Sequence, residues 1–178
     1  MNIPDTERLQ YALIDESDAE LMYELDQDTE VMRYINGGKA TTREEIQEVY
    51  LPRLAKYSNP EKGWGMWKLT IRENGQFIGW ILVRPMDFFS DNPKWDDWEL
   101  GWRLKRDAWG KGFATEAAKH VMSALAKQPE VKHFSAIAMP GNDASINIMK
   151  KLGMTYQKTG IHSDPLGDEE VVYYTLKL

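Results

Sequence analysis

The stretch WGKGFATEAA, residues 109–118, places two glycines around a lysine immediately before an alanine-rich segment. Gly110 and Gly112 would weaken any regular element that they interrupted, so they predict a sharp bend or a close approach of the backbone to something else. Residues 113–127 repeat apolar positions at helical spacing and are predicted to form a helix. The glycines then lie at a helix N-terminus, where free N–H groups and the positive end of the helix dipole favour an anion. We therefore predict that this loop binds a phosphate group.

The segments on either side of the glycine loop predict a β-α-β crossover. Residues 94–105, KWDDWELGWRLK, read as a strand that leads into the loop, and residues 131–139, VKHFSAIAM, read as a buried strand after the helix. In such units a ligand binds at the carboxyl end of the first strand, where the loop meets the helix. The predicted phosphate site lies at that place.

Further strands are predicted on both sides of this crossover. Residues 6–14 read as a short strand, and residues 64–84 carry the clearest hairpin pattern, with Asn74-Gly75 as a favoured type I′ turn pair. Two more strands, at 154–160 and 169–178, close the chain. The sheet therefore contains more strands than the crossover alone supplies.

Helices are predicted mainly in the first third of the chain, within residues 15–57. Thr42 and Glu45 stand at capping-box spacing, and Pro52 is expected to kink or divide the helix that they begin. Taken together, the order of strands and helices predicts a single mixed α/β (α+β) domain over residues 1–178, built on one sheet.

Composition limits the classes of function. The 178 residues are 42% hydrophobic and 28% charged, which is typical of a globular domain. No apolar run is long enough to span a membrane and the N-terminus lacks a signal pattern, so we expect a cytoplasmic protein with no membrane partner. The absence of cysteine excludes disulfides, thiolate metal sites and a Cys nucleophile. The net charge of −6 argues against nucleic acid, and the three histidines lack metal-ligand spacing, so no metal site is predicted.

Spacing tests two common phosphate-binding loops. A P-loop needs Ser or Thr after Gly-Lys, whereas Lys111 is followed by Gly112. A dinucleotide fingerprint needs a third glycine where Thr115 stands, and no acidic residue closes the next strand to hold a ribose. The first loop type is excluded and the second is poorly supported.

The stretch ELGWRLKRDAWGKGFATEA, residues 99–117, resembles the GNAT superfamily of N-acetyltransferases, and most of all its RimJ/RimL-like branch. The family loop reads Gln/Arg-x-x-Gly-x-Gly/Ala, and here Gly112 and Ala114 occupy the glycine and small-residue places, with Trp109 where Gln or Arg is usual. A second signature, Asn-x-x-Ala/Ser with a glycine eight places later, is supplied by Asn142, Ser145 and Gly153. The two motifs stand in the order and at the separation that the family has.

This resemblance implies a fold and a co-substrate. The expected fold is a GNAT-like domain with a central, mostly antiparallel sheet of six to seven strands and helices on both faces. The expected ligand is acetyl-CoA, whose pyrophosphate would lie on the loop N–H groups, where a Cβ would block its approach. A tight turn without a ligand is the alternative, and Asn142 could be a plain helix cap. The residues expected to contact acetyl-CoA are Trp102, Leu104, Trp109, Gly110, Lys111, Gly112, Phe113, Ala114, Thr115 and Asn142.

The implied reaction is acetyl transfer to a primary amine by direct attack in a ternary complex. The amine must first lose a proton, because an ammonium group with a pKa of about 10.4 is almost wholly protonated at pH 7. Glu99 is the candidate base, although it could instead belong to a solvated acidic edge or pair with Arg103. Met149 stands where many relatives have a Tyr acid, so Ser145 is the candidate acid, or else an ordinary small residue of a first helical turn.

The sequence leaves the acceptor open. The RimJ/RimL likeness suggests a protein N-terminal amine, and the alternatives are a small amine such as a drug or polyamine, or a non-catalytic CoA-binding regulatory module. Residues 85–98 form the loop most expected to contact the acceptor. The protein is expected to be a monomer or a homodimer. The acidic residues of the loop either attract a cationic amine or are simply solvated: Asp87, Asp91, Asp96 and Asp97.

Overall fold

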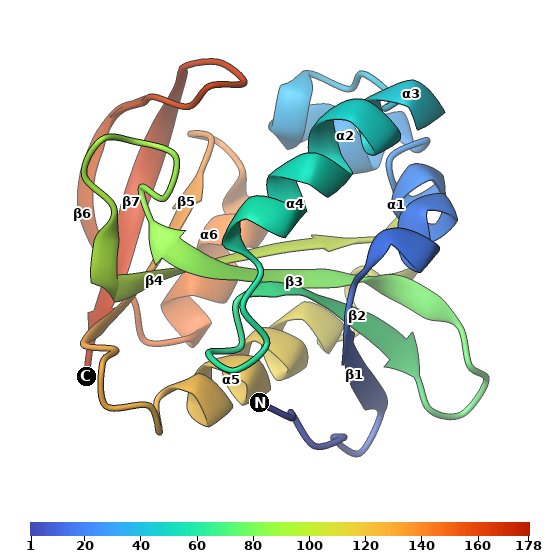
Figure 1. Ribbon diagram of the computed structural model, residues 1–178, viewed down its shortest axis with the longest axis horizontal. Coiled ribbons are helices and arrows are strands. Elements are labelled where there is room, and N and C mark those ends of the chain that lie inside the picture. Colours follow the sequence, from blue (N-terminus) through green and yellow to red (C-terminus); the bar gives the residue numbers. More distant parts are fainter.

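The computed structural model describes residues 1–178 as one α/β domain built on a seven-stranded sheet (Figure 1). The strand order is β1-β2-β3-β4-β5-β7-β6. The strands are β1 (Leu9–Leu13), β2 (Gly65–Ile71), β3 (Phe77–Met86), β4 (Lys94–Leu104), β5 (His133–Ala138), β6 (Thr155–His162) and β7 (Glu169–Lys177). The helices are α1 (Ala19–Leu25), α2 (Thr29–Asn36), α3 (Arg43–Glu45), α4 (Leu51–Tyr57), α5 (Phe113–Leu125) and α6 (Asp143–Lys151).

The sheet is mostly antiparallel, as predicted, because β4 and β5 form its one parallel pair. A parallel pair needs a crossover connection. Here the connection is the glycine loop and α5, so the predicted β-α-β unit is confirmed. The predicted number of strands is confirmed as well.

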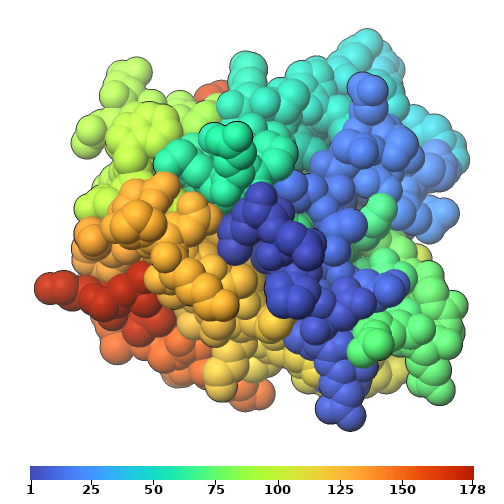
Figure 2. Space-filling model, turned by 60° about the horizontal axis from the view of Figure 1, so that its bottom comes forward, coloured from blue at the N-terminus to red at the C-terminus, as the bar shows by residue number.

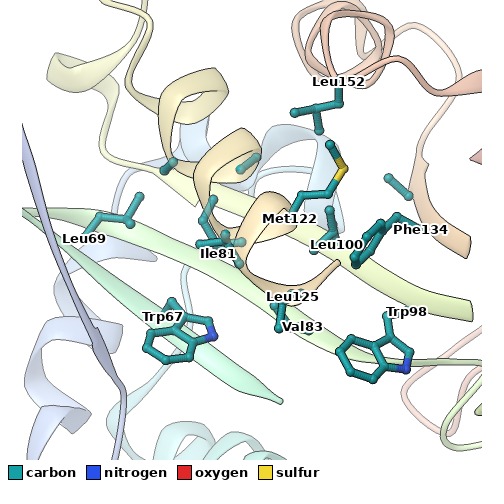
Figure 3. Close-up of a cluster of buried hydrophobic side chains, with 14 of the residues drawn as sticks. Trp67, Leu69, Ile81, Val83, Trp98, Leu100, Met122, Leu125, Phe134 and Leu152 are labelled. Carbon is teal, nitrogen blue, oxygen red and sulfur yellow. The ribbon is translucent and has the colours of Figure 1, made fainter. Parts of the chain in front are cut away.

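Helices cover both faces of the sheet (Figure 1). On one face α5 and α6 pack over the larger hydrophobic core, in which Ile81 and Val83 of β3 meet Trp98 and Leu100 of β4 and Phe134 of β5 (Figure 3). On the other face α1, α4 and the helical turn between α3 and α4 enclose a smaller core. Side chains alternate along a strand. Glu99, which lies between Trp98 and Leu100, therefore faces α1–α4.

The N-terminal residues close the edge of the α5 face. The Met1 amino group donates to the Pro60 carbonyl at 2.6 Å, and the His120 ring lies 2.7 Å from the Pro4 carbonyl oxygen. Ile3 is buried between these contacts. Figure 2 shows this dark blue segment lying against the orange and yellow surface of α5. Ile3 is thus part of the domain core, and its neighbours are held on the surface of the domain by these contacts.

The β2–β3 connection differs from the predicted type I′ turn. That turn needs positive φ at both central residues, but only Gly75 has one, at 71°. The Gly75 amide donates to the Ile71 carbonyl at 2.8 Å, and the Ile71 amide donates to the Gln76 carbonyl at 2.9 Å. Asn74 instead accepts the Gln76 amide through its side chain at 2.9 Å. The prediction was wrong because this side-chain bond stabilises a longer loop.

The helical segment from Arg43 to Tyr57 begins as predicted, since the Glu45 amide donates to the Thr42 hydroxyl at 3.0 Å. Pro52 coincides with a change of helix type: a π-helical turn, Ile46–Tyr50, leads into α4, and Pro52 lies in the first turn of α4. A proline is tolerated there because it interrupts few helical hydrogen bonds. No helix in the structure has the length and apolar character needed to cross a membrane.

Candidate active site

The parallel strands β4 and β5 separate at Glu99. Their pairing is limited to three residue pairs and ends at Glu99 and Ser135. Beyond this point β4 continues to Leu104 paired only with β3, while β5 continues paired with β7. Glu99 therefore lies at the apex of a gap between two diverging strands.

A cavity of about 530 Å³ lies at the carboxyl end of this gap. Its walls come from α2, the last residues of β4, the glycine loop with the start of α5, and one side of α6. The lining residues are Glu30, Val31, Arg33, Tyr34, Ile35, Trp102, Arg103, Leu104, Ala108, Trp109, Gly110, Gly112, Phe113, Ala114, Thr115, Asn142, Ala144, Ser145, Asn147, Ile148 and Lys151.

The glycine loop presents free backbone amides to this cavity. The amides of residues 110–115 donate to no acceptor within the chain, and the first helical bond of α5 runs from the Glu116 amide to the Gly112 carbonyl at 3.0 Å. Gly110 and Gly112 have φ values of 70° and 78°, a region that side-chain-bearing residues rarely adopt. Consecutive free amides at the positive end of a helix dipole form an anion-binding site.

Arg8 and Trp109 fix the shape of the loop without using those amides. The Arg8 Nη1 group donates to the Lys111 carbonyl at 2.8 Å, its Nε group donates to Glu116 at 3.1 Å, and its guanidinium lies 4.2 Å from the centre of the Phe113 ring. The Trp109 indole N–H donates to the Leu104 carbonyl at 3.0 Å, although 47% of the residue is exposed. The amides are therefore held in place before any anion binds.

Nearly all of the residues that the sequence predicted as ligand contacts line this one cavity. Lys111 is the exception, because its side chain is exposed and lies outside the lining. Of the two candidate catalytic residues, Ser145 lines the cavity and Glu99 does not. The predicted contacts found in the lining are Trp102, Leu104, Trp109, Gly110, Gly112, Phe113, Ala114, Thr115 and Asn142.

Ser145 is tied to β4 across the gap. The Trp102 indole N–H donates to the Ser145 hydroxyl at 2.9 Å. Asn142 caps α6, since its side chain accepts the Ser145 amide at 3.4 Å, and this agrees with the plain-cap interpretation. Met149 is completely buried in the core and has no polar group to offer. The Ser145 hydroxyl is thus the α6 group that is held against Trp102 in the cavity.

Glu99 forms a buried ion pair with Arg84, its direct partner across the β3–β4 ladder. The Arg84 Nε group donates to one carboxylate oxygen at 2.8 Å and its Nη2 group to the other at 3.4 Å. Burial lowers the pKa of Arg84, but the Glu99 carboxylate raises it, and the net pKa is above the ordinary value. The expected alternative partner, Arg103, instead donates to Asp26 at 2.8 Å. The solvated-edge interpretation of Glu99 is wrong, because the residue is 5% exposed.

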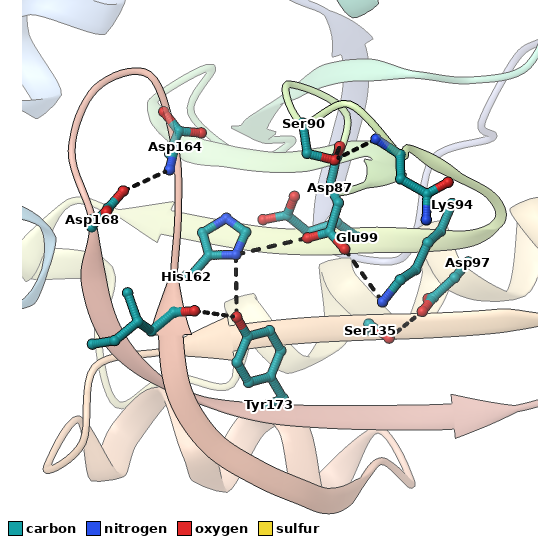
Figure 4. Close-up of polar contacts among 12 residues, drawn as sticks. Asp87, Ser90, Lys94, Asp97, Glu99, Ser135, His162, Asp164, Asp168 and Tyr173 are labelled. Atoms are coloured by element: carbon teal, nitrogen blue, oxygen red, sulfur yellow. Dashed lines mark hydrogen bonds and ion pairs between the residues drawn. The ribbon is translucent and has the colours of Figure 1, made fainter.

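Polar side chains from three segments surround Glu99 (Figure 4). Asp87 lies 3.3 Å from the Lys94 ammonium and 3.8 Å from the His162 ring, and His162 lies 3.4 Å from the Tyr173 hydroxyl. Burial raises the pKa of Tyr173, as do the negative charges of Asp87 and Glu99. The β3–β4 loop and the β6–β7 hairpin therefore meet beside Glu99.

The acidic loop is only partly solvated. Asp87 is held in the ion pairs above, and Asp97 accepts the Ser135 hydroxyl at 2.9 Å. Burial raises the pKa of Asp97, against the lowering effect of that hydrogen bond. Asp91 and Asp96 are exposed. Two of the four aspartates are thus engaged inside the protein, and two are free to meet solvent.

Sequence reasoning missed one wall of the cavity, the α2 residues that include Tyr34 and Arg33. Ile35 lies on the same helical face as the buried Val31 and Met32 but is 36% exposed and lines the cavity, and nothing in the sequence distinguishes it from a core position. Sequence reasoning also missed Arg84, whose pairing with Glu99 depends on the register of two strands.

Comparison with known proteins agrees with this geometry. Residues 8–155 match the family model for the acetyltransferase (GNAT) domain. YkkB of Bacillus subtilis (strain 168) is 30% identical over 86% of each chain, and FsC-acetyl coenzyme A-N(2)-transacetylase of Aspergillus fumigatus is 29% identical over 93% of this chain and 71% of its own. The structure of RimL, the ribosomal L7/L12 alpha-N-protein acetyltransferase, in complex with coenzyme A shares the fold, with a TM-score of 0.76 at 14% identity over 100% of this chain and 98% of its own. The chain belongs to the GNAT acetyltransferase family and is an acetyl-CoA-dependent N-acetyltransferase.

Proposed function

We propose that the protein transfers an acetyl group from acetyl-CoA to a primary amine, by direct attack of the amine while both substrates are bound. The observation that carries this proposal is the run of free amides at residues 110–115, on the wall of a cavity that opens where β4 and β5 diverge. Such amides match a diphosphate, and the gap between the strands gives an extended arm a path from the amides toward Glu99.

The residues of the cavity fit acetyl-CoA. The amides of residues 110–115 would hold its pyrophosphate, and at Gly110 a Cβ would point into open space, so nothing in the protein fills that position. Asn142 and the backbone of β4 at Trp102 and Leu104, which no longer pairs with β5, would hold the pantetheine arm along the gap. When bound there, acetyl-CoA supplies a thioester whose acetyl carbon accepts the amine and whose sulfur leaves.

Two side chains are assigned proton transfers. Glu99, at the apex of the gap, would take the proton that the amine loses as its C–N bond forms. Ser145 would give a proton to the departing sulfur, and the indole of Trp102, 2.9 Å from its oxygen, would hold the hydroxyl in place. The chain has no cysteine that could carry the acetyl group as an intermediate, which agrees with direct attack of the amine on acetyl-CoA.

The acceptor is proposed to be either a protein N-terminus or a small amine. The name of RimL, an alpha-N-protein acetyltransferase, supports the first, and the name of the fungal N(2)-transacetylase says only that it acetylates a nitrogen. Asp91 and Asp96, exposed in the segment from the β3–β4 loop to the start of β4, would favour a cationic amine. The RimJ/RimL-like assignment is therefore tested by the choice of acceptor.

The test has two steps. Thermal unfolding is first measured with and without CoA, because a ligand at about one hundred times its Kd adds roughly 2.7 kcal/mol of stability. Release of free thiol from acetyl-CoA is then measured with spermidine, tyramine and peptides that have a free N-terminus. Turnover with any of these supports the enzyme. CoA binding without turnover on any acceptor supports the alternative, a regulatory module, and no binding at millimolar CoA contradicts both.

A further inference from the structure

We propose that Arg84 is a positioning residue of this site: its guanidinium fixes the Glu99 carboxylate at the apex of the β4–β5 gap for proton transfer. This inference rests on the proposed function, because it assigns Arg84 a role that acts through Glu99. A purely structural ion pair is the alternative, and the two make different kinetic predictions.

The geometry of the pair is suited to orienting a carboxylate. Arg84 and Glu99 stand opposite each other in the β3–β4 register, and Arg84 contacts both carboxylate oxygens, at 2.8 and 3.4 Å. Two contacts between planar groups fix the rotation of the carboxylate as well as its position. The two side chains are only 11% and 6% exposed, so water competes little for these contacts.

Arg84 is itself held in place by the segments around it. Its guanidinium carbon lies 5.5 Å from the centre of the Tyr57 ring and 5.6 Å from that of Phe89. Arg53 of α4 covers Phe89 at 3.9 Å and forms an ion pair with Asp164 of the β6–β7 turn at 2.6 Å. Arg84 therefore has little freedom to swing away. Because its guanidinium is fixed, the Glu99 carboxylate that it contacts is fixed as well.

The strand register links this pair to the gap. Glu99 is the last residue of β4 that pairs with β5, and β3 and β4 stay in regular register from Glu99 to Leu104. The cavity lining of β4 begins at Trp102, three residues farther on. The bond to Arg84 of β3 thus holds the Glu99 carboxylate at the inner end of the gap, where the thioester is proposed to lie.

A double-mutant cycle on kcat tests the proposal. Arg84→Met is expected to lower kcat about 10- to 100-fold, with the KM for acetyl-CoA changed less than about threefold, because the glycine loop is untouched. In a Glu99→Gln background the same change should lower kcat by less than about threefold, since the group that Arg84 positions is already gone. Arg84→Lys, which keeps the charge, should recover part of the loss. Arg43→Met is the matched control, because it breaks an exposed Arg–Glu pair with Glu20 far from the gap and should leave kcat unchanged.

The measurement uses the acceptor from the panel above that wild type acetylates fastest, and circular dichroism checks that each variant folds. If Arg84→Met does not fold, the cycle is run with Arg84→Lys. Effects on kcat that multiply in the double variant, or an Arg84→Met enzyme with wild-type kcat, overturn the inference while leaving the proposed function standing. A wild-type protein that acetylates no acceptor overturns the proposed function and the inference together.

Discussion

The Trp102 indole donates a hydrogen bond to the Ser145 hydroxyl at 2.9 Å and so joins β4 to α6 across the gap between the diverging strands. The contact holds one side-chain hydroxyl of α6 against the strand that carries Glu99. Met149 is buried and its thioether has no proton to donate, so Ser145 is the proposed acid of the reaction and this contact holds it in place.

Replacing Ser145 by alanine should therefore lower kcat by about 10- to 100-fold, because the departing sulfur loses its proton donor. The KM for acetyl-CoA should change little. The free energy of unfolding should fall by about 1 kcal/mol, since the partly buried Trp102 indole loses its acceptor. Steady-state thiol release and urea unfolding measure the two effects. A variant with wild-type kcat would show that Ser145 only packs in the first turn of α6.

Replacing Gly110 by alanine should weaken CoA binding about tenfold or more, because a methyl group would point to where the diphosphate is proposed to lie. Gly75→Ala is the matched control: both glycines have nearly equal positive φ values, 70° and 71°, and open space beside them, but Gly75 lies in the β2–β3 turn. Both variants should lose about 1 kcal/mol of stability from backbone strain. Calorimetric titration with CoA checks the difference. Equal affinities in the two variants would contradict the assignment of the loop.

Replacing Arg53 by methionine should lower the free energy of unfolding by about 1–3 kcal/mol at pH 7, between the ranges for surface and buried ion pairs. Burial raises the pKa of Asp164, but the hydrogen bonds from Arg53 and the Leu166 amide and the positive charges of Arg53 and Arg84 together lower it more, so the net pKa lies below the ordinary value. The pair then contributes stability above the pKa of the unfolded carboxyl, about 3.9, and loses it as the pH falls through the lower, folded pKa.

The difference between wild type and Arg53→Met should accordingly shrink below about pH 4. Urea unfolding at several pH values from 7 to 3 measures it, with Arg43→Met as the exposed-pair control. A difference that stays constant down to pH 3 would mean that Arg53 acts through its packing on Phe89 and not through its charge.

Local sequence predicted the features that local geometry determines. The glycine loop, its helix and the Asn142 cap were predictable because each depends on residues a few positions apart. Nearly all of the predicted ligand contacts then fell in one cavity, since they lie on a single β-α-β unit and the start of the next helix.

Features that depend on distant parts of the chain could not be predicted. Glu99 pairs with Arg84 and not with Arg103, because the partner across β3–β4 is set by register and by what α1 and α4 bring to that face. The α2 wall of the cavity carries no motif. At Asn74 a side-chain hydrogen bond overrode the turn that the dipeptide favours.

The most direct test of the central claim is a titration of the isotope-labelled protein with CoA, followed by the backbone amide signals of residues 110–115. These amides have no acceptor within the chain, so binding of the diphosphate should shift them strongly and with a single Kd, while the amides of the β2–β3 turn stay unchanged. Binding of CoA that leaves the signals of residues 110–115 where they are, or no binding at millimolar CoA, would contradict the account.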